Sequence, residues 1–212
     1  KIILAASHPV LSTSRIGYDV RRAAVDLMCR FGYYDDLPRI IFIAGMALSG
    51  STWMNNLLAR VPGVFTRATP IPQEIAYRQD ICDDAFVNYP KRGHTLLKTH
   101  LNPTRENIDC IFNNGVEKVI VTYRDLRDVV VSHYYRLIEF PKDEAAFDYK
   151  DYRQMGKEKA VDSLIEHTAR YFIPWIHGWF EAARKEPGRY CFIRFEDLKT
   201  DTRGTFLKVL SF

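Results

Sequence analysis

Gly45 and Gly50 enclose a short turn whose composition suits an anion. Gly45 follows the apolar run 39–44, and the hydroxyl side chains of Ser51 and Thr52 come directly after Gly50. In a turn that joins a strand to a helix, backbone N–H groups converge on a bound anion, and the helix dipole adds to the attraction. The turn therefore predicts a phosphate site, with a plain serine-rich helix start as the alternative.

Lys98 and His100 form a second chemical group, at the end of the apolar run 94–98. Because they are two residues apart on an extended chain, both side chains point to the same side. A neutral histidine can accept a proton from a hydroxyl, and an ammonium group can neutralise charge that develops on a leaving phosphate. The pair predicts an acid–base site, although a histidine at a strand end is also compatible with a structural role.

Arg124 and Ser132 form a third group, where the apolar run 117–123 passes into a helical pattern. They are eight residues apart, about two helical turns, so both side chains can grip one phosphate. The alternative is a structural role, in which Arg124 forms an ion pair with Asp128 and the Ser132 hydroxyl forms a hydrogen bond within its own helix. Together with the turn at Gly45, this group points to a nucleotide that carries two separate phosphates.

Four apolar runs lack the alternation of half-exposed strands and favour a sheet covered on both faces. They are 39–44, 94–98, 117–123 and 190–194. Helical patterns cover 52–60, 104–113, 126–138 and 158–184, and Pro174 is expected to kink or restart the last helix. The alternation predicts an α/β fold. We expect a three-layer sandwich with a central, mainly parallel sheet, a P-loop-like phosphate-binding turn, and ligands at the carboxyl ends of the strands.

Composition narrows the class of protein. The chain of 212 residues is 47% apolar and 26% charged, which excludes disordered and fibrous classes and predicts one domain over 1–212. A net charge of +4 without a basic block predicts no nucleic-acid partner. The run 40–48 is too short to span a membrane, but a chain that opens on Lys1 is compatible with removal of an upstream anchor. The remaining histidines do not cluster with cysteines and carboxylates, so no metal site is predicted.

Taken together, these groups resemble the sulfotransferase family that uses 3′-phosphoadenosine 5′-phosphosulfate (PAPS), over about 40–212. The run Ser-Gly-Ser-Thr-Trp at 49–53 is similar to the family's 5′-phosphosulfate loop, whose tryptophan stacks on adenine. The resemblance implies His100 as general base and Lys98 as the cation on the donor. Looser matches at 195–198 and 70–74 add Glu74 on the substrate side. The donor-binding residues that it implies are Ser49, Gly50, Ser51, Thr52, Trp53, Arg124 and Ser132.

The resemblance implies an enzyme that moves a sulfuryl group from PAPS, without a metal, to a hydroxyl or amine of a small-molecule or glycan acceptor. We expect a cytoplasmic location for it. Two features depart from the family pattern. Leu48 stands where the family has a basic residue, and the sequence ends at Phe212, before the family's Gly-rich loop that closes over the 3′-phosphate. A catalytically impaired nucleotide-binding module is therefore one alternative. A P-loop kinase or NTPase is another, although Ser51 occupies the position of the P-loop lysine.

Overall fold

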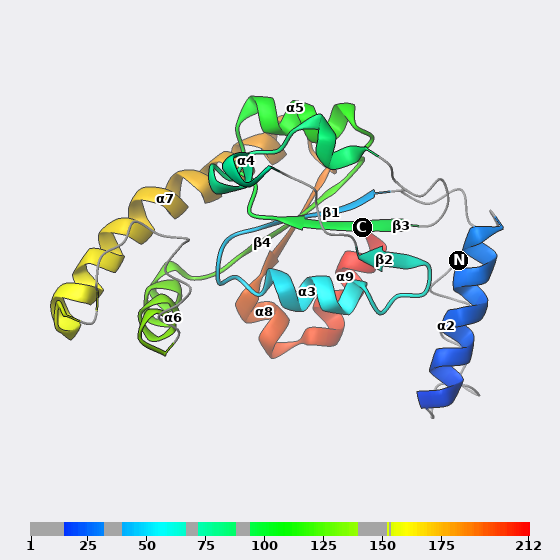
Figure 1. The fold of residues 1–212 in the computed structure, drawn as a ribbon, viewed down its shortest axis with the longest axis horizontal. Coiled ribbons are helices and arrows are strands. Elements are labelled where there is room, and N and C mark those ends of the chain that lie inside the picture. Colours follow the sequence, from blue (N-terminus) through cyan, green and yellow to red (C-terminus); the bar gives the residue numbers. More distant parts are fainter. Residues whose placement is uncertain (1–14, 32–39, 67–71, 88–93, 140–151, 153) are drawn as a thin grey trace.

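A five-stranded parallel sheet forms the centre of the molecule in the computed structural model (Figure 1). The structure describes all residues except 1–14, 32–39, 67–71, 88–93, 140–151 and 153. The strand order is β2-β3-β1-β4-β5. Their bounds are β1 (Ile40–Gly45), β2 (Val64–Thr66), β3 (His94–Thr99), β4 (Val119–Tyr123) and β5 (Tyr190–Arg194). The predicted α/β class is confirmed, with every described strand pair parallel.

Helices cover both faces of this sheet (Figure 1). Above it in that view lie α4 (Gln73–Tyr77), α5 (Arg105–Asn113) and the end of α7 (Lys157–Lys185). Below it lie α3 (Ser51–Leu58), α8 (Phe195–Thr200) and α9 (Thr202–Ser211). Outside these layers are α2 (Arg15–Arg30), beside β2, and α6 (Leu126–Glu139), which packs on the first part of α7; the 3-10 turn η2 covers Asp83–Phe86.

Alternate side chains of β1 fill two separate cores. Phe42 and Ala44 face the α5 and α7 side, whereas Ile43 faces the α3, α8 and α9 side, and all three are completely buried. Val121 and Ile120 divide between the same two cores on β4. A strand buried on both faces needs apolar residues at successive positions, which explains the lack of alternation in the sequence.

Several elements were not predicted from the sequence, and one helix is continuous where a break was among the expectations. β2 has three residues and α8 six, too few for a periodic pattern to stand out, and no helix was predicted at α2 or α9. α7 runs as one helix of 29 residues through Pro174, so of the two expectations for this residue, a kink or a restart, the restart does not occur. None of the helices within the described ranges has the length and apolar character needed to cross a membrane.

The strand order identifies the edge at which a ligand site is expected. From β1 the chain passes to β2 at the edge and returns to β3, which pairs with β1 on one side, and β4 then pairs with β1 on the other side. Such a reversal opens a crevice at the carboxyl ends of the central strands. The chain leaves β1 at Gly45, β3 at Thr99 and β4 at Tyr123, so the three predicted chemical groups are expected to lie near one another.

Candidate functional site

The turn between β1 and α3 is held by a buried serine. Ser49 is 1% exposed; its Oγ donates to the Met46 carbonyl at 2.6 Å and lies 2.8 Å from the hydroxyl of Thr122 on β4. Because the serine proton is engaged by Met46, Thr122 donates in the second bond. The Ser49 amide also donates to the Met46 carbonyl, at 3.2 Å. Both donors of Ser49 are thus used inside the turn, which they brace.

Both glycines of the turn are required by close packing. A Cβ at Gly45 would lie 2.4 Å from Cβ of Ser51, and a Cβ at Gly50 would lie 2.6 Å from the Phe195 ring. Gly50 also has φ 75°, in the left-handed region that favours glycine. It is the N-cap of α3 and offers no side-chain acceptor, so no cap from Gly50 competes with an anion for the amides of the first turn.

Lys98 reaches from β3 to the start of α3. Its Nζ donates to Oγ1 of Thr52 at 3.2 Å. Burial lowers the pKa of the Lys98 ammonium from its usual value. The structure thus brings the lysine to the turn that is predicted to hold the 5′ end of a nucleotide.

His100 is joined to the same turn from the end of β3. Its Nδ1 lies 2.5 Å from the Gly45 carbonyl, which can only accept, so Nδ1 carries the hydrogen. Nε2 of the neutral ring is then the nitrogen with the free lone pair. Burial is the main cause that lowers the pKa of His100 below 6.5, and the charges of Lys98 and Arg136 lower it further. The hydrogen bond to Gly45 opposes this shift. The imidazole is therefore neutral at pH 7 and can act as a base.

The segment after His100 rests on α7. Trp175 donates from Nε1 to the Leu101 carbonyl at 2.8 Å, and Leu101 is completely buried. Gly178 packs so closely that a Cβ there would lie 2.5 Å from Pro103. These contacts fix the chain that leaves β3 and thereby the position of His100.

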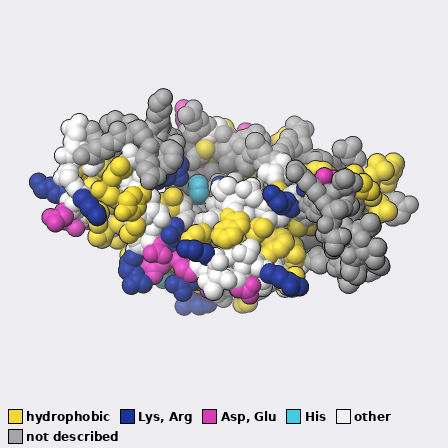
Figure 2. Space-filling view, turned by 90° about the horizontal axis from the view of Figure 1, so that it is seen from below, with side chains coloured by type: hydrophobic (Ala, Val, Ile, Leu, Met, Phe, Trp, Pro, Cys, Tyr) yellow, Lys and Arg dark blue, Asp and Glu magenta, His cyan; other side chains and the backbone are white. Residues whose placement is uncertain are grey.

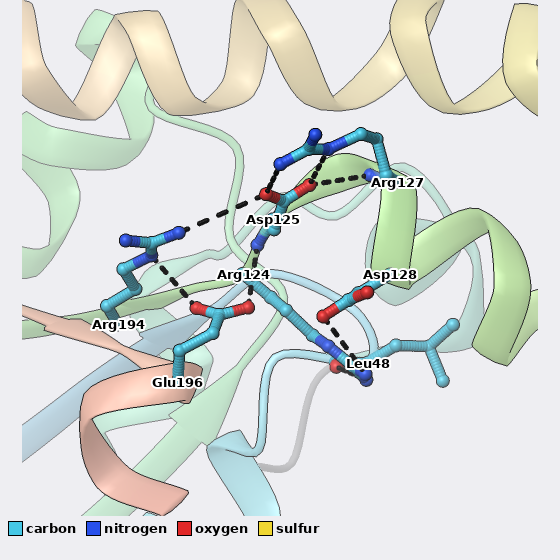
Figure 3. Close-up of polar contacts among 7 residues, drawn as sticks. All are labelled: Leu48, Arg124, Asp125, Arg127, Asp128, Arg194 and Glu196. Carbon is cyan, nitrogen blue, oxygen red and sulfur yellow. Dashed lines mark hydrogen bonds and ion pairs between the residues drawn. The ribbon is translucent and has the colours of Figure 1, made fainter. Parts of the chain in front are cut away.

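Arg124 links the two predicted phosphate turns (Figure 3). Its Nη1 donates to the carbonyl of Leu48 at 3.3 Å, and its Nη2 lies 3.9 Å from the Asp128 carboxylate. The guanidinium also lies 4.4 Å from the centroid of the Phe195 ring. Within the described ranges, its buried Nε has no hydrogen-bond acceptor. A buried donor without an acceptor costs free energy, and an anion at this place would supply one.

Ser132 lies half-buried on α6, two turns beyond Arg124. Its hydroxyl makes no hydrogen bond within the part of the chain that the structure describes. The predicted alternative, in which Arg124 pairs with Asp128, is present only as a long contact at 3.9 Å.

The remaining predicted residues lie at the margin of the site. The Trp53 ring is half-buried and meets the Phe195 ring edge-on, with centroids 6.3 Å apart. Glu74 is exposed in the first turn of α4, and the structure gives it no hydrogen bond or ion pair with another described residue. Of its loosely matched segment, residues 70 and 71 lie outside the described residues.

Leu48 has an unusual backbone in the same turn. Its φ is 62°, which a leucine rarely adopts, and its carbonyl faces Arg124 (Figure 3). Its side chain packs half-buried against the core on the α5 and α7 side. The resemblance expects a basic side chain at position 48. The protein has a leucine there, and the backbone carbonyl of this leucine accepts a hydrogen bond from Arg124.

Sequence reasoning missed one residue of this arrangement, Thr122, and gave no role to Phe195 and Glu196, which both lie in the loosely matched run 195–198. Thr122 anchors Ser49, and Phe195 lies against both Gly50 and Arg124. Glu196 accepts a hydrogen bond from the Asp125 amide at 3.1 Å. A hydroxyl at the penultimate position of a buried strand was the available signal for Thr122.

The surface around α3, α8 and α9 has mixed charge (Figure 2). Basic and acidic side chains lie next to one another there, between apolar patches, with no continuous basic area among the described residues of this face. Within the described ranges, no three side chains of His, Cys, Asp or Glu lie close enough together to hold a metal ion.

Comparison with known proteins assigns the class. The sulfotransferase domain family matches residues 38–212, so the chain belongs to this family. The chain is 24% identical to flavonol 3-sulfotransferase of Flaveria bidentis over 191 residues, 82% of this chain and 56% of that protein. It is 26% identical to sulfotransferase 1A1 of Bos taurus over 199 residues, covering 84% and 60% of the two chains. Over 200 residues it is 23% identical to sulfotransferase 1E1 of Mus musculus, covering 85% and 62%. The chain thus spans less than two thirds of the length of each of these relatives.

Proposed function

We propose that this protein transfers a sulfuryl group from PAPS to a hydroxyl or amine of a small-molecule or glycan acceptor. The observation that carries the proposal is the joint attachment of His100 and Lys98 to the phosphate turn, through Gly45 and Thr52. A base and a cation are thereby held beside a turn suited to a phosphate. Membership of the sulfotransferase domain family supports the reaction class.

The donor-binding roles follow from the free polar groups of the site. Amides of Ser51, Thr52 and Trp53 at the start of α3 would hold the 5′ end, and the ring of Trp53 would meet the adenine. Ser49 and Gly50 would shape the turn. Arg124, through its unpartnered Nε, and the hydroxyl of Ser132 would hold the 3′-phosphate. Charge-assisted bonds to a guanidinium are the strong class of phosphate contact.

The transfer step can be written with its protons and electrons balanced. The acceptor oxygen forms a bond to sulfur while its proton passes to Nε2 of His100. The bond between sulfur and the bridging oxygen breaks, and its electron pair remains on the 5′-phosphate. Lys98 stabilises that charge, which develops as the bond breaks. Protein cations and dipoles carry the charge in this proposal, so no divalent metal enters the step.

Leu48 favours one alternative function, that of a protein which binds the nucleotide but catalyses sulfuryl transfer poorly. A leucine at the mouth of the turn contributes no charge to the bridging oxygen. An ATP-dependent kinase is less favoured because Ser51 replaces the phosphate-gripping lysine.

Ligand-dependent thermal stability distinguishes these functions. The proposal predicts that adenosine 3′,5′-bisphosphate raises Tm without magnesium, because a ligand that binds only the folded state stabilises it. Stabilisation by Mg-ATP alone would instead support the kinase. If the bisphosphate stabilises the protein but no acceptor yields turnover, the protein is a binding module.

We further propose that residues 1–212 form one domain and that the protein acts in a reducing compartment such as the cytoplasm. Cys82, Cys110 and Cys191 are free thiols, which supports the second statement. Glu74 is proposed on the acceptor side, on the strength of the sequence resemblance alone.

A further inference from the structure

The ends of β4 and β5 leave the sheet side by side. The two strands pair in parallel, with Tyr123 opposite Arg194. The residues that follow, Arg124 on one strand and Phe195 on the other, are therefore neighbours, and the guanidinium of Arg124 lies over the Phe195 ring. The start of α8 can thus act directly on the turn that carries Arg124.

Glu196 connects these two strand ends through its carboxylate (Figure 3). One oxygen accepts the backbone N–H of Asp125 at 3.1 Å, and the other lies 3.0 Å from Nε of Arg194. The Glu196 side chain is 28% exposed, so its hydrogen bond to Asp125 and its ion pair with Arg194 are partly shielded from water. A charged acceptor makes a stronger bond to a backbone amide than a neutral one.

Asp125 is also held from the other side. Arg127 donates to its carboxylate from the backbone amide at 3.0 Å and from the side chain at 2.6 and 3.0 Å. These bonds hold the pKa of Asp125 well below its usual range, so its charge persists at neutral pH. With its amide and its carboxylate both engaged, Asp125 has little freedom, and the backbone of the preceding residue, Arg124, is fixed.

We propose that Glu196 is a positioning residue that holds the Asp125 amide and thereby aims Arg124 at the 3′-phosphate. The inference rests on the proposed function, in which Arg124 binds that phosphate. Glu196 touches neither substrate nor reacting atoms and acts through the turn alone. Removal of its carboxylate leaves the Asp125 amide without its acceptor and leaves Arg194 with only its 3.9 Å contact to the Asp125 carboxylate.

The test measures affinities for two nucleotides by calorimetry. The ratio of the Kd of adenosine 5′-phosphate to that of adenosine 3′,5′-bisphosphate reports what the 3′-phosphate contributes to binding. Glu196→Ala is expected to lower this ratio at least tenfold while the Kd of adenosine 5′-phosphate changes less than threefold. Glu196→Gln keeps an oxygen that accepts from Asp125 and is expected to retain most of the ratio.

Two further variants complete the design. Glu196→Asp keeps the charge but withdraws the carboxylate by one methylene, and it is expected to lower the ratio as Glu196→Ala does. If Glu196→Ala fails to fold, the ratio measured for Glu196→Asp still tests the proposal. Glu186→Ala is the matched control, because Glu186 makes an exposed ion pair with Arg189 just before β5 and is expected to leave both affinities unchanged.

The outcomes separate this inference from the proposed function. If the wild-type protein binds both nucleotides equally, the proposed function fails. If the wild type prefers the bisphosphate and Arg124→Ala abolishes the preference while Glu196→Ala and Glu196→Asp keep it, the positioning role is overturned. An equal loss of affinity for both nucleotides in the Glu196 variants would also overturn it, because that pattern reports general damage to the site.

Discussion

Nδ1 of His100 lies 2.5 Å from the carbonyl oxygen of Gly45, so the candidate base and the phosphate turn are one hydrogen-bonded unit. The bond fixes the tautomer and leaves Nε2 to accept a proton. Gly45 cannot be replaced by a larger residue, because a Cβ would meet Ser51 at 2.4 Å. The close packing that forms the turn thus also sets the orientation of the base.

The first prediction concerns the pH dependence of kcat/KM. Burial and the charges of Lys98 and Arg136 lower the pKa of His100 below 6.5. A base must be neutral to act, so activity is expected to be constant near pH 7 and to fall only as the pH drops through this lowered pKa. Arg136→Gln should move the acid limb toward higher pH because one opposing charge is lost. An acid limb above pH 6.5 in the wild type would contradict the assignment.

The second prediction concerns Arg124. Arg124→Ala should weaken binding of adenosine 3′,5′-bisphosphate by about 1.5–3 kcal/mol, the range for a charge-assisted contact. Binding of adenosine 5′-phosphate should change much less. Arg105→Ala is the control, since the Arg105 side chain on α5 is 90% exposed and pairs only with Asp109 among the described residues. Equal losses for the two nucleotides with Arg124→Ala would refute the 3′-phosphate role.

The third prediction concerns Leu48. Leu48→Lys should raise turnover at least tenfold, which corresponds to about 1.4 kcal/mol in the barrier. Charge builds on the bridging oxygen during bond cleavage, so a cation there favours the transition state over the product nucleotide. The bond from the Arg124 guanidinium to the backbone carbonyl of residue 48 does not depend on the Leu48 side chain, and affinity for the bisphosphate should change little. Leu48→Met controls for side-chain length, and equal turnover in all three proteins would show that another cation serves the bridging oxygen.

The fourth prediction concerns stability in acid. His133 on α6 is 2% exposed beside His167 of α7, and burial, with the charges of His167 and Arg136, lowers its pKa to about 4. The unfolded chain therefore binds a proton at this site below about pH 6.5 that the folded protein binds only near pH 4. The free energy of unfolding should fall by about 2 kcal/mol from pH 7 to pH 5 through this residue.

Urea unfolding at both pH values checks this expectation. His133→Leu should remove most of the pH-dependent loss, whereas His177→Ala should not, because the His177 side chain is 73% exposed. A His133→Leu protein that loses as much stability between pH 7 and pH 5 as the wild type would disprove the role of His133.

The sequence allowed the long strands and helices to be predicted better than the short elements between them. Long runs such as 117–123 and 158–184 carry the apolar patterns of buried strands and helices, and the structure confirms both elements. β2 and α8 were missed because elements of three and six residues lack a period, and their positions depend on contacts with distant strands. The turn at Gly45 and the groups at Lys98, His100 and Arg124 were predicted from local residue types.

The contacts between those groups required the fold. The bond from Arg124 to the Leu48 carbonyl spans 76 residues of sequence, and that from Asp125 to Glu196 spans 71. Neither leaves a local pattern, since each arises from the register of neighbouring parallel strands. The backbone of Leu48 was likewise not predictable, because no composition rule places a leucine at positive φ.

The most direct test of the account is the release of adenosine 3′,5′-bisphosphate from PAPS by the full chain, measured with a panel of phenols, alcohols, amines and glycans. We expect acceptor-dependent release by the wild type without added metal. His100→Ala should abolish this release and yet bind the bisphosphate within a few fold of the wild type, because the base contacts the transferred proton. Near-normal turnover by His100→Ala would contradict the assignment of the base, and no turnover by the wild type with any acceptor would contradict sulfuryl transfer itself.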